Sequence, residues 1–196
     1  MSCLAEYPQL KVIQKLASSH KVKIYLVGGF LRDYLLGRPK MDFDFAVWAP
    51  PSAKKTRGAI VFARAWARQI KGAFVLLDDE HGCARVVKKD GDMIQTFDFA
   101  DFRAKTLKED LAHRDFTINT MCVDLNNLIE KDMLKDVLMD EKNGQKDLKA
   151  GNIRMVSAGV FLEDPLRLMR AFSIKAVLDF KIEAKTLARI KKDKKT

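Results

Sequence analysis

Two aspartates in the stretch "DFDFAV" have the type and spacing for divalent-metal chemistry. Only Phe43 separates Asp42 from Asp44. In a strand, both carboxylates would therefore lie on one face, with Phe43 and Phe45 buried on the other. Two close carboxylates repel each other, and a hard cation with oxygen ligands, Mg²⁺ above all, relieves that repulsion. The pattern alone is also common on solvated strands.

A double glycine precedes the aspartates in "VGGFLRD". Gly28 and Gly29 close an apolar run, where backbone amides can approach a ligand without an intervening Cβ. A helix beginning there would favour phosphate at its N-terminus, and Arg32 could add a bidentate contact. A tight strand-to-helix turn explains the glycines equally well. The combination is more specific, because Asp42 follows Gly29 by thirteen positions and the two motifs lie on expected neighbouring strands. It favours a nucleoside triphosphate.

Hydrophobic periodicity predicts the elements that must position these residues. Strands are expected at 23–29, 42–47, 73–79, 83–89 and 93–102, and helices at 8–19, 30–37, from Ser52 to Ile70, at 106–125 and from Phe161 onward with a break near Asp179. Turns at "DDEHG" and "KDG" predict that the last three strands form an antiparallel meander. Thr106 and Glu109 form a capping box for the helix at 106–125. The order predicts an α+β fold with a helical tail.

Composition excludes several classes of protein. The chain has 196 residues, 47% of them hydrophobic, and no apolar run long enough to span a bilayer. Its beginning lacks the pattern of a secretory signal. Cys3, Cys83 and Cys122 are scattered and odd in number, which predicts neither a disulfide framework nor a zinc site and favours a cytoplasmic location. The net charge of +10 favours a polyanionic partner.

Four segments in order resemble the motifs of one family. "GGFLRDYLLGRPKMDFDFAV" resembles the first signature of the class II CCA-adding enzymes and bacterial poly(A) polymerases, which belong to the polymerase β-like nucleotidyltransferases. "EDLAHRDFTINTMCVDL" is similar to the second motif, "MDEKNGQKDLKAGNIRMV" to the degenerate third, and "EDPLRLMRAFSIKAVLDFKIEAKT" to the fourth, which selects the nucleotide. The resemblance covers Lys23 to Thr186.

The resemblance implies a polymerase β-like head, a mixed and largely antiparallel sheet flanked by helices, at 1–150 and the beginning of a helical neck at 151–196. It implies that Asp42 and Asp44 hold two catalytic Mg²⁺ ions and that Asp98 is a third catalytic carboxylate. A strand-end aspartate without a catalytic role is the alternative for Asp98. The implied nucleotide-binding residues are Gly28, Gly29, Arg32, Arg114, Asp115, Asn119, Asp164, Arg167 and Arg170.

Asp164 and Arg167 lie three residues apart, on one side of an expected helix. A carboxylate only accepts hydrogen bonds and a guanidinium only donates them. Cytosine and adenine each offer an amino donor beside a ring-nitrogen acceptor, whereas uracil and guanine reverse both groups. One such pair can therefore accept CTP and ATP and reject UTP and GTP. An ordinary helical ion pair is the alternative interpretation.

Two positions depart from the family pattern. His113 stands where the second motif usually has an arginine, which predicts a weaker or pH-dependent contact. Ser173 stands three residues after Arg170, where many members have a further arginine.

The resemblance implies an enzyme that adds C, A or both to the 3′ end of tRNA from CTP and ATP, with Mg²⁺ and release of pyrophosphate. A bacterial poly(A) polymerase has the same motifs and stays an alternative. A third hypothesis is a nucleotide- or RNA-binding fragment that needs a separate chain for the remaining neck, body and tail. It rests on the abrupt basic end "TLARIKKDKKT", where phosphate attraction is expected to be sensitive to salt.

Overall fold

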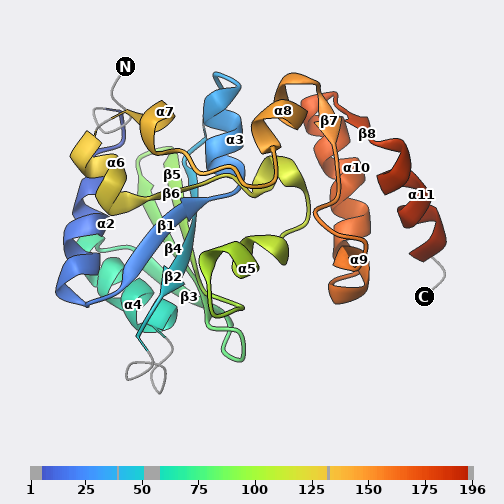
Figure 1. The fold of residues 1–196 in the computed structure, drawn as a ribbon. Helices are drawn as coiled ribbons and strands as arrows, with labels where there is room; N and C mark the ends of the chain where they lie inside the picture. The colour runs from blue at the N-terminus through green and yellow to red at the C-terminus, as the bar shows by residue number, and fades with distance from the viewer. Residues whose placement is uncertain (1–5, 39, 51–57, 132, 194–196) are drawn as a thin grey trace. The chain divides into compact units, whose positions relative to one another are not determined.

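The computed structural model describes residues 6–38, 40–50, 58–131 and 133–193. Two compact units are formed by 1–103 with 122–139, and by 104–121 with 140–196 (Figure 1). The chain thus leaves the first unit after Arg103, returns to it at Cys122 and leaves it again after Met139. The expected N-cap at Ser52 lies outside the described residues.

The first unit is built on a sheet of six strands in the order β3-β4-β5-β2-β1-β6. Its strands are β1 Lys23–Val27, β2 Asp42–Trp48, β3 Ala73–Asp78, β4 Cys83–Asp90, β5 Met93–Asp101 and β6 Cys122–Asp124. Its helices are α2 Pro8–Ser19, α3 Gly29–Leu35, α4 Gly58–Ile70, α6 Leu125–Lys131 and α7 Leu134–Val137. Among the described strands of this sheet, β2 and β5 pair in parallel, and the other neighbouring strands pair antiparallel.

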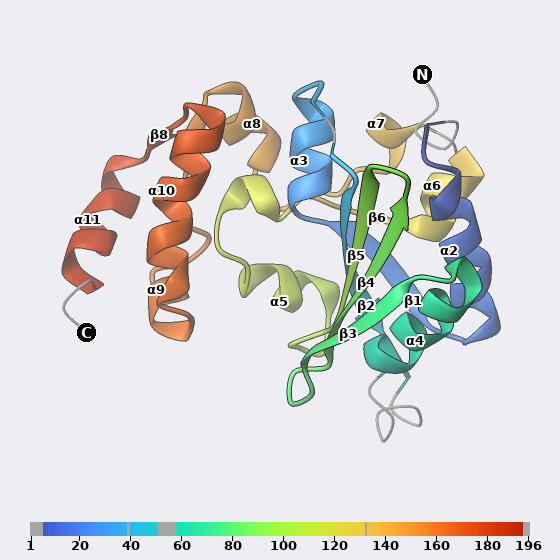
Figure 2. The same ribbon diagram turned by 180° about the vertical axis from the view of Figure 1, so that it is seen from behind.

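Aromatic side chains fill one side of the central strands, where α4 packs on β2 to β5 (Figure 2). Phe43 stacks on Phe97 with ring centroids 5.2 Å apart, and Phe45 stacks on Phe99 at 4.9 Å. All four rings are buried. Because side chains alternate along a strand, Asp42, Asp44 and Asp98 lie on the opposite side of the sheet. The alternation read from the sequence is therefore confirmed.

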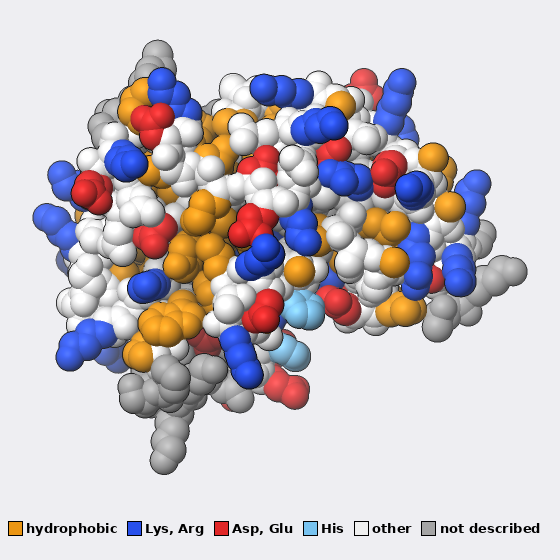
Figure 3. Space-filling view, in the orientation of Figure 1, with side chains coloured by type: hydrophobic (Ala, Val, Ile, Leu, Met, Phe, Trp, Pro, Cys, Tyr) orange, Lys and Arg blue, Asp and Glu red, His pale blue; other side chains and the backbone are white. Residues whose placement is uncertain are grey.

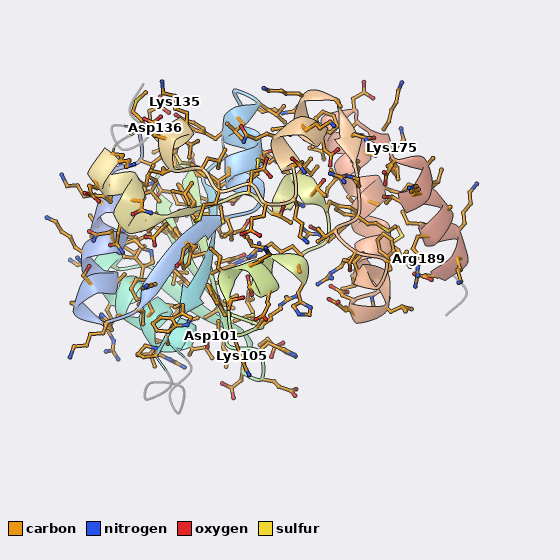
Figure 4. The ribbon with its side chains drawn as sticks, viewed as in Figure 1. Asp101, Lys105, Lys135, Asp136, Lys175 and Arg189 are labelled. Atoms are coloured by element: carbon orange, nitrogen blue, oxygen red, sulfur yellow. The ribbon has the colours of Figure 1, made fainter. Side chains whose placement is uncertain are left out.

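A carboxylate fixes the beginning of α4. Asp101, at the end of β5 and labelled in Figure 4, accepts a hydrogen bond at its Oδ1 from the backbone N of Ala59, 2.9 Å away. The interaction satisfies one of the free N–H groups in the first turn of the helix. Within the part of the chain that the structure describes, no helix is long and apolar enough to cross a membrane.

The second unit contains short helices and one small two-stranded sheet. Its elements are α5 Leu107–Ala112, the 3₁₀ turn η2 Thr117–Asn119, α8 Gly144–Lys149, β7 Asn152–Ile153, α9 Val160–Glu163, α10 Leu166–Leu178, β8 Lys181–Ile182 and α11 Ala184–Asp193. β7 and β8 pair in parallel. Phe116, Ile118, Ile153, Val160 and Phe161 are buried in this unit.

The helix expected at 106–125 is wrong beyond Ala112. The capping box at Thr106 and Glu109 is present, but α5 ends at Ala112, and the chain continues through η2 into β6. Two long-range interactions override the helical pattern. The backbone N of Thr117 donates to Arg154 O at 2.9 Å, and β6 pairs with β1.

The strand expected at 23–29 is two residues too long, because β1 ends at Val27 and α3 begins at Gly29. The helix expected from Phe161 onward is interrupted twice, between α9 and α10 at Pro165 and by the strand β8. The remaining expected elements that lie within the described residues agree with the structure. The strands of the meander pair antiparallel, and the break near Asp179 is a left-handed residue with φ 56° that ends α10. The predicted α+β class, with a mixed and mainly antiparallel sheet flanked by helices, is confirmed.

Candidate nucleotidyltransferase site

The double glycine forms the turn between β1 and α3. Gly28 has φ 75° and ψ −135°, a conformation that only glycine adopts without strain. The turn brings Gly29 close to two predicted site residues. A Cβ on Gly29 would lie 3.6 Å from Arg32 Nη2 and 3.7 Å from Asp44 Oδ2. The Gly29 backbone, the Arg32 guanidinium and the Asp44 carboxylate are therefore close together, which agrees with the predicted proximity of the glycine turn and the aspartates.

Asp33 holds the Arg32 side chain in place. Arg32 Nε lies 2.8 Å from Asp33 Oδ1, and Nη2 lies 3.0 Å from Oδ2. Both side chains are nearly buried, with 11% and 6% exposed. The bidentate geometry fixes the plane of the guanidinium. Sequence analysis missed Asp33, because residues adjacent in a helix do not normally face each other.

A row of charged side chains crosses three neighbouring strands. Asp44 on β2 is directly opposite Asp98 on β5, and Asp98 is directly opposite Arg85 on β4. Arg85 Nε and Nη2 each lie 2.7 Å from one oxygen of Asp98. Two residues earlier on β2 and β5, the Thr96 hydroxyl donates to Asp42, which lies directly opposite it. The structure therefore brings all three predicted catalytic carboxylates to one face.

The acidic face perturbs its arginine. The hydrogen bonds to Asp98 raise the pKa of Arg85 above its ordinary value, and the charges of Asp98, Asp44 and Asp42 add to the effect. Arg85 therefore remains a fixed cation beside the aspartates. Sequence analysis missed Arg85, although the "KDG" turn predicts the register of the two strands that it connects. A tight hairpin that pairs Asp90 with Met93 places Arg85 opposite Asp98.

The carboxylates fit a magnesium ion that shares its coordination with substrate. No group of three or more His, Cys, Asp or Glu side chains in the described ranges is arranged as a complete metal cage. Mg²⁺ usually binds through one or two carboxylates, with waters and substrate phosphates as the other ligands. Asp42 is exposed and Asp44 half-buried, so solvent and a ligand can reach this face.

In the second unit, Asp115 gathers two other predicted residues. Its Oδ1 accepts from Asn119 Nδ2 at 2.9 Å and from the backbone N of Phe116 at 2.7 Å. Its Oδ2 accepts from Arg170 Nε at 2.9 Å. Asp115 and Asn119 are buried, while the Arg170 side chain is 59% exposed. Asp115 therefore orients both donors within this unit.

Arg114 has a donor that the described residues leave unsatisfied. Its Nε is buried and has no hydrogen-bond partner among them. Its Nη2 lies 3.8 Å from Asp110 Oδ2, which is a weak ion pair. A buried donor without an acceptor is unfavourable.

Residues of the third motif hold the turn η2 of the second motif in place. Asp147 Oδ2 accepts from Thr117 Oγ1 at 2.5 Å and from Arg154 Nε at 2.8 Å. Gly144 allows the backbones to approach, since a Cβ there would lie 2.4 Å from Thr117 O. These contacts fix η2, the turn that carries Asn119. Asp147 and Arg154 are supporting residues that the predicted site did not include.

Asp164 and Arg167 lie close together at the beginning of α10. Asp164 Oδ1 accepts from the backbone N of Leu166 at 2.9 Å, and Asp164 Oδ2 is 3.6 Å from Arg167 Nε. Arg167 is only 5% exposed. Its Nη1 also donates to Val160 O at 3.1 Å and to Glu163 Oε2 at 3.3 Å. Glu163 is a second carboxylate that sequence analysis did not include.

The described residues thus form two groups, one in each unit. Gly28, Gly29, Arg32, Asp42, Asp44 and Asp98 belong to the first unit, and Arg114, Asp115, Asn119, Asp164, Arg167 and Arg170 belong to the second. Lys and Arg side chains are spread over the face drawn in Figure 3, with acidic side chains between them. On that face the positive charge is not concentrated in one patch.

Comparison with known proteins gives consistent matches. A family model described as "Poly A polymerase head domain" matches residues 24–154. The CC-adding tRNA nucleotidyltransferase of Geobacter sulfurreducens is 40% identical over 183 residues, covering 93% of this chain and 38% of that protein. The chain therefore spans well under half the length of this relative.

Two solved structures extend the comparison. A CCA-adding enzyme in complex with CTP is 33% identical, with a TM-score of 0.75 over 96% of this chain and 41% of that one. The Thermotoga maritima CCA-adding enzyme in complex with tRNA is 34% identical, with a TM-score of 0.74 over 94% of this chain and 41% of that one.

Proposed function

This chain belongs to the poly(A) polymerase head-domain family of nucleotidyltransferases, and from that premise we propose that it adds C, A or both to the 3′ end of tRNA. The donors are CTP and ATP, the product is pyrophosphate, and no nucleic-acid template is used. The row of Asp42, Asp44 and Asp98 beside the Gly28–Gly29 turn carries this proposal. The activities of the relatives agree with it, a CC-adding tRNA nucleotidyltransferase and a CCA-adding enzyme in complex with tRNA.

Asp42 and Asp44 are the residues that would hold Mg²⁺. When bound, the ions would activate the 3′-hydroxyl and stabilise the charge of the leaving pyrophosphate. Arg32, oriented by Asp33, would bind the triphosphate next to the Gly29 backbone. Arg85 orients Asp98 towards the same face. Each oxygen of Asp98 keeps a further lone pair for a metal or a proton after its bond to Arg85.

Base selection is proposed for the second unit. Asp164 would accept a hydrogen bond from the amino group of cytosine or adenine, and Arg167 would donate one to the ring nitrogen. UTP and GTP would place donor against donor and acceptor against acceptor, leaving buried polar groups unpaired. Arg114, whose side chain is 24% exposed, would contact a phosphate in this unit. Asp115 would act by orienting Asn119 and Arg170.

Two further proposals concern the organisation of the protein. Residues 1–150 are proposed as the head and 151–196 as the beginning of the neck. Efficient binding of tRNA is proposed to need the additional length that the relatives have, in the same chain or as a separate one, because this chain spans 38% of the Geobacter protein.

The description of the matched family model favours poly(A) polymerase as the second candidate function. A cytoplasmic location stays a prediction.

The experiment that tests the proposal measures product length. Transcripts of tRNA that end in the discriminator base, in C or in CC are incubated with the chain, Mg²⁺ and one labelled nucleoside triphosphate at a time, at low ionic strength. Addition of one to three residues supports a CC-adding, A-adding or CCA-adding enzyme. Long A tails would instead support a poly(A) polymerase. The absence of extension on every substrate would contradict both activities for the chain alone and would support the third hypothesis, a nucleotide- or RNA-binding fragment that needs the remaining neck, body and tail.

A further inference from the structure

One oxygen of Glu163 is shared by two side chains of the second unit. His113 Nδ1 lies 3.2 Å from Glu163 Oε2, and Arg167 Nη1 lies 3.3 Å from the same atom. His113 follows α5, Glu163 ends α9, and Arg167 is in the first turn of α10. The contact therefore joins three elements at the arginine proposed to read the base.

The three residues are held to different degrees. Arg167 is 5% exposed and bound to Val160 O, so its position depends on the end of α9. The His113 and Glu163 side chains are 44% and 38% exposed. The backbone of His113 is fixed at the end of α5. The capping box sets where that helix begins, and the backbone N of His113 donates to Asp110 O at 3.1 Å. Glu163 is thus the adjustable member of the three.

Two carboxylates compete for the Arg167 guanidinium. Glu163 Oε2 is 3.3 Å from Nη1, and Asp164 Oδ2 is 3.6 Å from Nε. Base reading needs Arg167 paired with Asp164 and directed at the nucleotide. A carboxylate only accepts hydrogen bonds, so a second donor on Glu163 restrains it and limits how far it draws the guanidinium towards itself. The His113 Nδ1–H is such a donor.

We propose that His113 is a positioning residue that acts through Glu163 on Arg167 and so contributes to the selection of cytosine and adenine. The inference rests on the proposed function. It gives a role to His113, which the predicted site residues did not include. Without this donor, Glu163 turns either to solvent or fully onto Arg167. Both movements change the direction in which the guanidinium points.

The test measures binding of CTP, ATP, UTP and GTP to the 196-residue chain with Mg²⁺ by competition. The selectivity is the ratio of the dissociation constants of UTP to CTP and of GTP to ATP. His113→Ala should lower both ratios about three- to fivefold, the range of one partly exposed charged contact. Competition by inorganic triphosphate should stay unchanged. His113→Asn places an amide N–H near the position of Nδ1–H and should restore the ratios.

Two controls separate positioning from general damage. His81 makes a similar contact in the first unit, with its Nδ1 2.7 Å from Asp78 Oδ2, and His81→Ala should leave the ratios unchanged. In a Glu163→Gln background, His113→Ala should have no further effect, since its route to Arg167 has already been altered.

Three outcomes would overturn the inference. The first is that His113→Ala keeps the wild-type selectivity ratios. The second is that it loses affinity equally for all four nucleotides and for triphosphate. The third is that the effects of His113→Ala and Glu163→Gln on the ratios are fully additive. Failure of the proposed function gives a different result, because the wild-type chain would then bind no nucleotide or bind all four equally. A selective wild type with an equally selective His113→Ala variant would count against His113 alone.

Discussion

Replacing Asp147 by alanine should destabilise the second unit more than a single exposed ion pair would. The Asp147 side chain is 9% exposed, and its carboxylate accepts from the Thr117 hydroxyl at 2.5 Å and from Arg154 Nε at 2.8 Å. Asp147→Ala leaves the buried Thr117 hydroxyl without this acceptor and leaves Arg154 without its carboxylate partner. The substitution also removes an interaction that fixes the turn carrying Asn119.

The magnitude follows from burial. A hydrogen bond to a charged group contributes about 1.5–3 kcal/mol, and losing one partner of a buried ion pair costs about 3–5 kcal/mol. The Arg154 side chain is 35% exposed and can be hydrated again, so we expect a loss at the lower end, about 3 kcal/mol. For a chain of this size, each kcal/mol lowers Tm by about 2–4 °C. The expected fall is therefore about 6–12 °C.

Thermal unfolding followed by circular dichroism measures the effect. Lys108→Ala is the matched control in the same unit, because the Lys108–Glu141 pair spans 3.3 Å but its side chains are 75% and 48% exposed. Such a pair contributes about 0–1 kcal/mol. Asp147→Asn keeps an acceptor and should lie between the two. A fall in Tm for Asp147→Ala no larger than that for Lys108→Ala would refute the supporting role of the third motif.

Arg85→Ala removes the cation that pairs with Asp98 on the face that also carries Asp42 and Asp44, so its Tm in EDTA should fall by about 2–4 °C, for roughly 1 kcal/mol from a partly exposed pair. Added Mg²⁺ should stabilise this variant more than the wild type, and equal melting curves would contradict the assignment. Arg167→Ala should reduce discrimination against UTP and GTP more than affinity for triphosphate; a uniform loss in competition binding would argue against the base-reading pair. Burial raises the pKa of the Cys83 thiol, so its thiolate forms only at higher pH. Alkylation at pH 8 should be slower than that of glutathione, and an equal rate would disprove the shift.

The local parts of the site could be predicted from sequence, because short-range chemistry determines them. Alternation in "DFDFAV" places Asp42 and Asp44 on one face, and the glycines predict the sharp turn after β1. Both agree with the structure. The capping box at Thr106 is likewise a local pattern and is present.

Long-range partners could not be read from the same patterns. The pattern at 106–125 suggests one helix, but a hydrogen bond from Thr117 to Arg154 and the pairing of β6 with β1 end it at Ala112. Arg85 acts on Asp98 through strand register, and Glu163 acts on Arg167 across the break at Pro165. Tertiary contacts of this kind override local preference.

The rate of transfer from labelled CTP or ATP to tRNA, compared between the wild-type chain and the Asp42→Ala and Asp44→Ala variants, tests the central claim most directly. If these carboxylates hold Mg²⁺ for the transfer of the nucleotide, each variant should lose about a thousandfold or more in rate. Its circular dichroism spectrum should match that of the wild type. Near wild-type transfer by either variant with an unchanged spectrum would contradict the account.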